Sequence, residues 1–172
     1  MGMKAQELVT RAGLDLSALL KELNSAYCDE WLAYYQYWIG AKVADGKMAS
    51  LVAKELAEHA GEELEHAEKL ANRITELGGT PAIAPELWLK ESTCGFLAPK
   101  DPQACVLLKQ NIQGERCAIE VYHKLLEMVK GKDLVTEHLV REILEDELEH
   151  EQDLEDLHSS CMEHDSKKCA HK

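Results

Sequence analysis

Six acidic and imidazole side chains fall on helical faces that are otherwise apolar. They are Glu30, Glu63, His66, Glu115, Glu147 and His150. Glu30, for example, lies between Tyr27 and Tyr34 on one such face. A buried carboxylate without a partner is costly, and no Lys or Arg shares these faces at the same level, so cations must come from elsewhere. Two divalent metal ions would balance four carboxylates, with one imidazole on each ion.

The candidate ligands occur in two copies of one pattern. EELEHAEKL at 62–70 matches DELEHEQDL at 146–154, and both contain Glu-x-x-His. A Glu and a Tyr seven residues apart also recur, as Glu30 with Tyr37 and as Glu115 with Tyr122. The copies are offset by 84 and 85 residues. Because residues three apart share a helical face, each copy brings a carboxylate and an imidazole to one level, related by a pseudo-twofold axis.

Several neighbouring side chains are candidates for assisting these ligands. Glu62 and Asp146 precede the two glutamates of the Glu-x-x-His motifs and either accept a hydrogen bond from a ligand imidazole or are surface acids. Tyr37 and Tyr122 either hydrogen-bond to ligands or pack in the bundle. His59 lies one turn before Glu63, and we favour a packed core histidine over a transient metal ligand.

These residues require four long helices to position them. Apolar residues recur every three or four positions in four segments: from Asp15 or Ser17 to before Asp45, from about Met48 to Gly78, from Asp101-Pro102 to Gly131, and from Asp133 onward. Residues 79–100 contain Pro81, Pro85, Gly95 and Pro99 and form a connection, with a short helical turn at 86–90. We expect an all-α four-helix bundle with one long crossover between helices two and three.

Length and charge restrict the class of protein. The chain of 172 residues fits one domain, which we place at 1–160, followed by a mobile tail at 161–172 with scattered Cys, His and Lys. A net charge of −13 disfavours DNA binding and favours cations as partners. The sequence contains neither an apolar signal segment nor a membrane span, so we expect a cytoplasmic protein.

The metal-ligand pattern resembles that of the ferritin-like di-iron carboxylate superfamily, over residues 15–158. STCG at 92–95 and GERCAI at 114–119 resemble the Dps-like thioferritin branch, which is related to bacterioferritin and Dps. The resemblance implies a ferroxidase with two iron ions per subunit that oxidises Fe(II), with hydrogen peroxide in preference to oxygen. It also implies a homo-oligomer, a cage of twelve subunits that stores ferric iron and protects against oxidative stress.

Some departures from related families narrow the function. Leu64 occupies the position where bacterioferritins have a haem-binding Met, so we expect no haem. No Cys-x-x-Cys pair is present for a rubredoxin module. A manganese catalase or a rubrerythrin-like peroxidase without iron storage is the alternative, since these ligands also accept manganese or zinc.

Six cysteines occur in the chain, and we expect most to be free thiols. The resemblance suggests that Cys94 and Cys117 form a redox pair near the metals, although two ordinary buried thiols fit the sequence equally. No partner is predicted for Cys28 or Cys105. In the tail, the spacing of Cys161, His164, Cys169 and His171 matches no closed zinc site.

Overall fold

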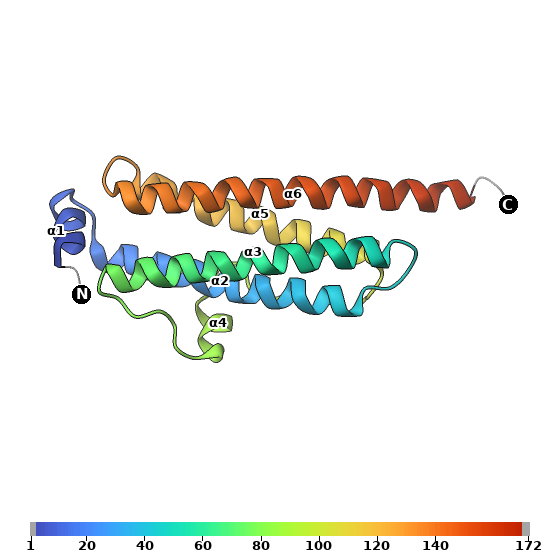
Figure 1. The fold of residues 1–172 in the computed structure, drawn as a ribbon, viewed down its shortest axis with the longest axis horizontal. Helices are drawn as coiled ribbons and strands as arrows, with labels where there is room; N and C mark the ends of the chain where they lie inside the picture. Colours follow the sequence, from blue (N-terminus) through green and yellow to red (C-terminus); the bar gives the residue numbers. More distant parts are fainter. Residues whose placement is uncertain (1–2, 170–172) are drawn as a thin grey trace.

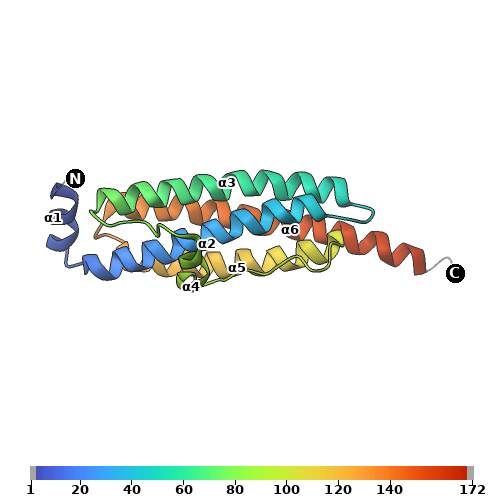
Figure 2. The ribbon, with the colours of Figure 1, turned by 90° about the horizontal axis from the view of Figure 1, so that it is seen from below.

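The chain folds into two long antiparallel hairpins joined by a crossover (Figures 1 and 2). The computed structural model describes residues 3–169, with side chains up to Met162. The helices are α1 (Met3–Arg11), α2 (Leu16–Val43), α3 (Ala49–Glu76), α4 (Pro85–Glu91), α5 (Ala104–Val129) and α6 (Leu134–Cys169). Helices α2 and α3 form one hairpin and α5 and α6 the other, and α4 packs on α2. The predicted all-α four-helix bundle with its long crossover is confirmed.

Local sequence signals explain where the hairpin helices begin. Asp15 caps α2, since its Oδ1 accepts hydrogen bonds from the backbone N–H groups of Ser17 (2.9 Å) and Ala18 (3.1 Å). Asp133 similarly accepts the N–H of Thr136 (3.3 Å) at the start of α6. Gly131 supplies a positive φ of 69° in the turn between α5 and α6. These caps lie where the sequence predicts them.

The start of α5 differs from the prediction. Gln103, and not Asp101, is the N-cap, and the helix begins at Ala104. The carbonyl of Pro102 accepts the N–H of Asp45 (2.8 Å), and the carbonyl of Asp45 accepts the N–H of Ala104 (3.0 Å). This pairing with the α2–α3 turn holds Gln103 in an extended conformation, as an isolated parallel bridge with Asp45, so the helix starts two residues later than expected.

The described part of the chain contains helical structure near both of its ends that the sequence did not predict. The nine-residue helix α1 buries Val9 against the bundle, and Gln6 Nε2 donates to the carbonyl of Leu77 (3.0 Å). Helix α6 runs past residue 160, and Cys161 is buried in the core. The side chains of His164, Cys169 and His171 lie outside the described part. Cys161, the first residue of the predicted tail, therefore belongs to α6 and to the packed core.

The apolar core is divided into two clusters along the bundle. One contains Leu23 and Ile74, and the other contains Leu56 and Leu154. The six candidate ligands are distributed over the four hairpin helices. On each helix they lie between residues of one cluster and residues of the other. Apolar packing on both sides therefore excludes water from one polar layer. Within residues 3–169, none of the helices combines the length and apolarity that crossing a membrane requires.

Candidate metal centre

The structure brings all six candidate ligands together in the middle of the bundle. They form two groups, Glu30, Glu63, His66 and Glu147 in one, and Glu63, Glu115, Glu147 and His150 in the other. Within each group the donor atoms lie within 4.8 Å of one another. Glu63 and Glu147 belong to both groups, whereas Glu30 and Glu115 each belong to one. Each Glu-x-x-His motif therefore provides one shared carboxylate and one imidazole.

Each imidazole directs Nδ1 toward the carboxylates. His66 Nδ1 lies 3.3 Å from Glu147 Oε1 and 3.4 Å from Glu63 Oε2. His150 Nδ1 lies 3.3 Å from Glu63 Oε1 and 3.4 Å from Glu147 Oε2. Both histidines thus contact both shared glutamates. The spacing is suited to two cations between the shared carboxylates, each with one imidazole nitrogen.

Two acids on the opposite hairpins orient these rings. His66 Nε2 donates to Asp146 Oδ2 (3.1 Å), and His150 Nε2 donates to Glu62 Oε2 (2.9 Å). A proton on Nε2 leaves the lone pair of Nδ1 free to bind a metal ion. The sequence left open whether Glu62 and Asp146 accept hydrogen bonds from the imidazoles or are only surface acids. In the structure both accept such a hydrogen bond.

The two tyrosines of the repeated pattern reach across the bundle to the unshared glutamates. Tyr37 of α2 donates to Glu115 of α5, and Tyr122 of α5 donates to Glu30 of α2. Burial, followed by the charge of the nearby glutamates, raises the pKa of both phenols well above the usual value. Both therefore remain neutral donors. One oxygen of each unshared glutamate is occupied, and the other is available.

The buried carboxylates repel one another. All six candidate ligands are at most 3% exposed. Burial, and then the charges of Glu63 and Glu147, raise the pKa of Glu30 well above its usual value. Burial alone would lower the pKa of His150, but the nearby carboxylates of Glu147 and Glu63 raise it to about 12. The site therefore attracts positive charge strongly.

The atoms without a hydrogen-bond partner show where a cation would bind. Among the described side chains, they include one or both oxygens of every candidate glutamate and Nδ1 of both candidate histidines. These atoms are Glu30 Oε2, Glu63 Oε1, His66 Nδ1, Glu115 Oε2, Glu147 Oε1 and Oε2, and His150 Nδ1. Buried polar atoms are seldom left unpaired, and here these unpaired atoms gather in the two groups of candidate ligands. The residues fit a dinuclear metal centre.

A cavity of about 70 Å³ adjoins this centre. Its lining includes Glu30 and Glu115 on one side and Cys94, Gly95 and Leu97 of the crossover on the other. Cys94 is joined by a disulfide to Cys117 of α5, with a Cα–Cα distance of 5.7 Å. The pair suggested by the family resemblance is thus bonded, and Cys94 lies at the cavity and not among the candidate ligands.

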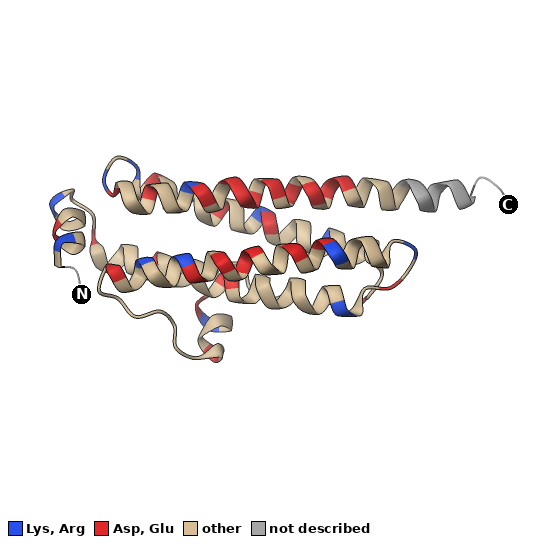
Figure 3. Ribbon diagram, in the orientation of Figure 1, with Lys and Arg blue, Asp and Glu red and all other residues tan. Residues whose placement is uncertain are grey.

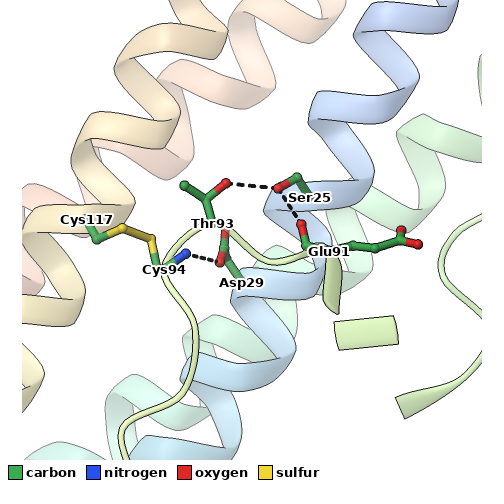
Figure 4. The surroundings of a disulfide bond; sticks show 6 residues. All are labelled: Ser25, Asp29, Glu91, Thr93, Cys94 and Cys117. Carbon is green, nitrogen blue, oxygen red and sulfur yellow. Dashed lines mark hydrogen bonds between the residues drawn. A yellow bond between two sulfur atoms is a disulfide. The ribbon is translucent and has the colours of Figure 1, made fainter. Parts of the chain in front are cut away.

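The crossover is also held against α2 near this disulfide (Figure 4). Asp29 Oδ1 accepts the backbone N–H of Cys94 (2.7 Å), and Ser25 Oγ donates to the carbonyl of Glu91 (2.8 Å). The sequence reading did not identify Asp29, because only the folded crossover brings a donor to it. The acid next to the candidate ligand Glu30 therefore positions the wall of the cavity.

Other cysteines differ from the expectation of mostly free thiols. Cys105 of α5 and Cys161 of α6 form a second disulfide, with a Cα–Cα distance of 5.8 Å. Among the described side chains Cys28 is free and buried. A signal for Cys161 did exist, since it lies seven residues after the core residue Leu154 and continues the same helical face.

A family comparison agrees with this geometry. A model of the ferritin-like domain matches residues 20–162. The chain belongs to the ferritin-like family. The resemblance noted from the ligand pattern, including its relation to Dps and bacterioferritin, is confirmed.

Individual relatives of this ferritin-like chain include two known proteins. The DNA protection during starvation protein of Pyrococcus furiosus is 36% identical over 154 residues, which cover 88% of this chain and 83% of that protein. The bacterioferritin of Desulfovibrio desulfuricans is 30% identical over 133 residues, covering 77% and 69%.

A solved structure is also very similar. It is the bacterioferritin-related protein of Bacteroides fragilis, described as a dodecameric thioferritin. It has a TM-score of 0.94 and 38% identity, and the match covers 96% of this chain and 98% of that chain.

Proposed function

We propose that this chain is the subunit of a Dps-like ferritin that oxidises Fe(II) and stores the ferric product. Iron is the substrate, and two ions bind per subunit, one in each group of candidate ligands. The observation that carries the proposal is the sharing of Glu63 and Glu147 between the two groups. Carboxylates placed between two ions hold them close enough to react with one oxidant molecule.

The side chains have separate tasks in this reaction. His66 and His150 each offer Nδ1 to one ion, held in place by Asp146 and Glu62. The negative charge of the glutamates favours the ferric over the ferrous state, which promotes the loss of an electron from each ion. Tyr37 and Tyr122 keep the unshared glutamates in position through their O–H groups.

Hydrogen peroxide is the proposed oxidant, with oxygen as the slower one. Each of two Fe(II) ions gives up one electron, and peroxide takes both electrons and two protons to form two water molecules. Because both electrons are taken at one site, no hydroxyl radical is released. The cavity beside Glu30 and Glu115 provides room for a molecule of this size.

Storage requires a closed shell, and we propose a homo-oligomeric cage of twelve subunits. Support comes from the Bacteroides fragilis protein, which is described as dodecameric and matches 96% of this chain. The net charge of −13 per chain would attract ferrous ions to such a shell. The same charge disfavours DNA as a partner.

Stopped-flow oxidation of Fe(II) tests the catalytic part of the proposal. The Glu63→Ala variant is expected to lose at least about a hundredfold in rate with peroxide, because Glu63 serves both ions. Glu120→Gln is the matched control, since Glu120 is an exposed acid of α5 and its loss should leave the rate unchanged. Equal rates in the parent and Glu63→Ala would contradict the proposal.

Size-exclusion chromatography with iron analysis tests storage. A particle of about twelve subunits that gains a ferric core on addition of Fe(II) and peroxide is expected. Steady oxygen evolution from peroxide with bound manganese, and no ferric core, would instead identify a catalase. Iron binding without rapid oxidation would identify a passive metal buffer.

A further inference from the structure

His59 is a buried histidine without a hydrogen-bond partner, outside the six candidate ligands. It is 3% exposed, and its Nδ1 has no partner among the described residues. Its Nε2 lies 3.6 Å from Glu55 Oε1, which is longer than a hydrogen bond. A core histidine normally satisfies at least one ring nitrogen, so packing alone does not account for this residue.

His59 lines an acidic groove between α3 and α6. The groove has a volume of about 320 Å³. Six carboxylates line it, namely Glu55, Glu58, Glu62, Asp146, Glu149 and Asp153. Figure 3 shows acidic residues along both helices in this region. Lys54 also lines the groove and lies 3.5 Å from Glu58. The excess of negative charge favours a cation.

Three donors in this groove converge on one point. One donor atom from each of Glu55, His59 and Asp153 lies within 4.8 Å of the others. Glu55 and His59 are four residues apart and so project from one face of α3, while Asp153 faces them from α6. Burial and the nearby charge of Asp153 raise the pKa of Glu55, which agrees with carboxylates crowded together.

The three donors adjoin the dinuclear centre. The ring of His59 stacks on that of His150, with centroids 4.1 Å apart and planes inclined by 19°. Glu62, the acid that orients His150, also lies near His59, since donor atoms of the three residues are within 4.8 Å of one another. The groove therefore leads from the surface to the back of one metal-binding imidazole.

We propose that Glu55, His59 and Asp153 bind a third divalent cation, distinct from the two in the dinuclear centre. One imidazole and two carboxylates form a ligand set that accepts Fe²⁺, Mn²⁺ or Zn²⁺, with water completing the coordination. Its position makes it a staging site for iron moving along the groove. The staging role rests on the proposed function, whereas cation binding does not.

Zn²⁺ is the probe for binding, because it undergoes no redox reaction. Crystals of the parent protein soaked in Zn²⁺ are expected to show anomalous peaks at three places per subunit, two in the centre and one between His59 and Asp153. Peaks in the centre without one in the groove would overturn this inference and leave the proposed function intact. A groove peak without peaks in the centre would support the inference and overturn the proposed function.

Calorimetric titration with Zn²⁺ gives a second readout. The Asp153→Asn and Glu55→Gln variants should each lose the third equivalent and keep the other two. Glu58→Gln is the matched control, because Glu58 lines the same groove but belongs to none of the groups of converging donors. A parent and variants with identical stoichiometry would contradict the assignment of these ligands.

The staging role has its own test in the kinetics of iron oxidation. In Asp153→Asn the first two Fe²⁺ ions per subunit should be oxidised at the parent rate, since the dinuclear ligands are unchanged. Later additions should be oxidised several-fold more slowly, because delivery along the groove is impaired. Unchanged rates for later additions would show that bound cation does not pass through this site.

Discussion

At the scale of single residues, the candidate centre depends on contacts that cross between hairpins. Glu62 of the first hairpin orients His150 of the second, and Asp146 of the second orients His66 of the first. The tyrosines cross in the same manner. Each group of candidate ligands is thus supported by both halves of the duplicated pattern. Removing a supporting side chain from one hairpin therefore affects a candidate ligand on the other.

Replacing Asp146 by Asn should weaken metal binding without unfolding the protein. The amide still accepts the Nε2 hydrogen bond but loses the charge that makes the imidazole a better ligand, so affinity should fall about tenfold. An anaerobic Co²⁺ titration measures it. Glu62→Gln should behave alike, whereas Glu120→Gln should match the parent. Parent-like affinity in both variants would exclude an orienting role.

At the scale of helices, a buried ion pair connects the two hairpins at one end of the bundle. Arg73 of α3 donates two hydrogen bonds from Nη2 to Asp133, at 2.8 and 3.0 Å. Its Nε donates to Thr136 (2.8 Å) in the first turn of α6. Arg73 and Asp133 are 5% and 6% exposed, so this pair is shielded from water.

Replacing Arg73 by Met should lower the free energy of unfolding by about 3–5 kcal/mol, since Asp133 would keep a buried charge without its partner. Urea denaturation followed by circular dichroism measures the change. Lys54→Met, which removes an exposed pair with Glu58, should change it by less than about 1 kcal/mol. Similar losses in both variants would show that burial is unimportant here.

The ion pair of Arg73 and Asp133 also predicts how the stability of the protein depends on pH. Burial would raise the pKa of Asp133, but hydrogen bonds from Thr136 and Arg73 hold it below its usual value. An acid with a lowered pKa in the folded state adds stability above its unfolded pKa of about 3.9, and this is lost as the pH falls toward the folded pKa. In Asp133→Asn the loss of stability below about pH 4 should be shallower. An unchanged slope would contradict it.

The second disulfide ties the start of α5 to the C-terminal part of α6. Under oxidising conditions, the Cys105→Ser and Cys161→Ser double variant should be less stable than the parent by about 2–4 kcal/mol, because the bond closes a loop spanning 56 residues. In the presence of dithiothreitol the two proteins should unfold alike, which serves as the control. Equal stability under oxidising conditions would mean that the bond does not form.

At the scale of the whole molecule, a charge of −13 accompanies a strongly acidic groove. The charge acts over a distance set by salt, since the screening length shortens from about 30 Å at 0.01 M to about 8 Å at 0.15 M. Attraction of Fe²⁺ to the surface should therefore weaken as salt is added, whereas the chemistry in the buried centre should be little affected.

Raising the ionic strength over this range should slow Fe²⁺ oxidation several-fold when iron is limiting. At saturating iron the rate should stay constant, because only the buried centre then limits it. Stopped-flow absorbance at the two iron concentrations separates the cases. A rate independent of salt at limiting iron would show that surface charge does not guide the substrate.

The sequence by itself determined the four long helices and the register of the six ligand candidates. Apolar periodicity sets the face of each helix, and an acid such as Glu30 or Glu115 on that face is visible without a structure. The duplication then placed the Glu-x-x-His motifs at one level. The sequence did not predict the nine-residue helix α1, which docks on the bundle through buried Val9 and the hydrogen bond from Gln6 to Leu77.

Only the tertiary structure decided which residues meet across the bundle. The hydrogen bonds His66–Asp146 and His150–Glu62 join residues 80 and 88 positions apart, and Cys105 meets Cys161 across 56. That His59 Nδ1 lacks a hydrogen-bond partner also follows only from the tertiary structure, because it depends on which side chains of α6 lie opposite α3. Periodicity specifies the direction of a side chain from its own helix, whereas its partner depends on how the helices pack.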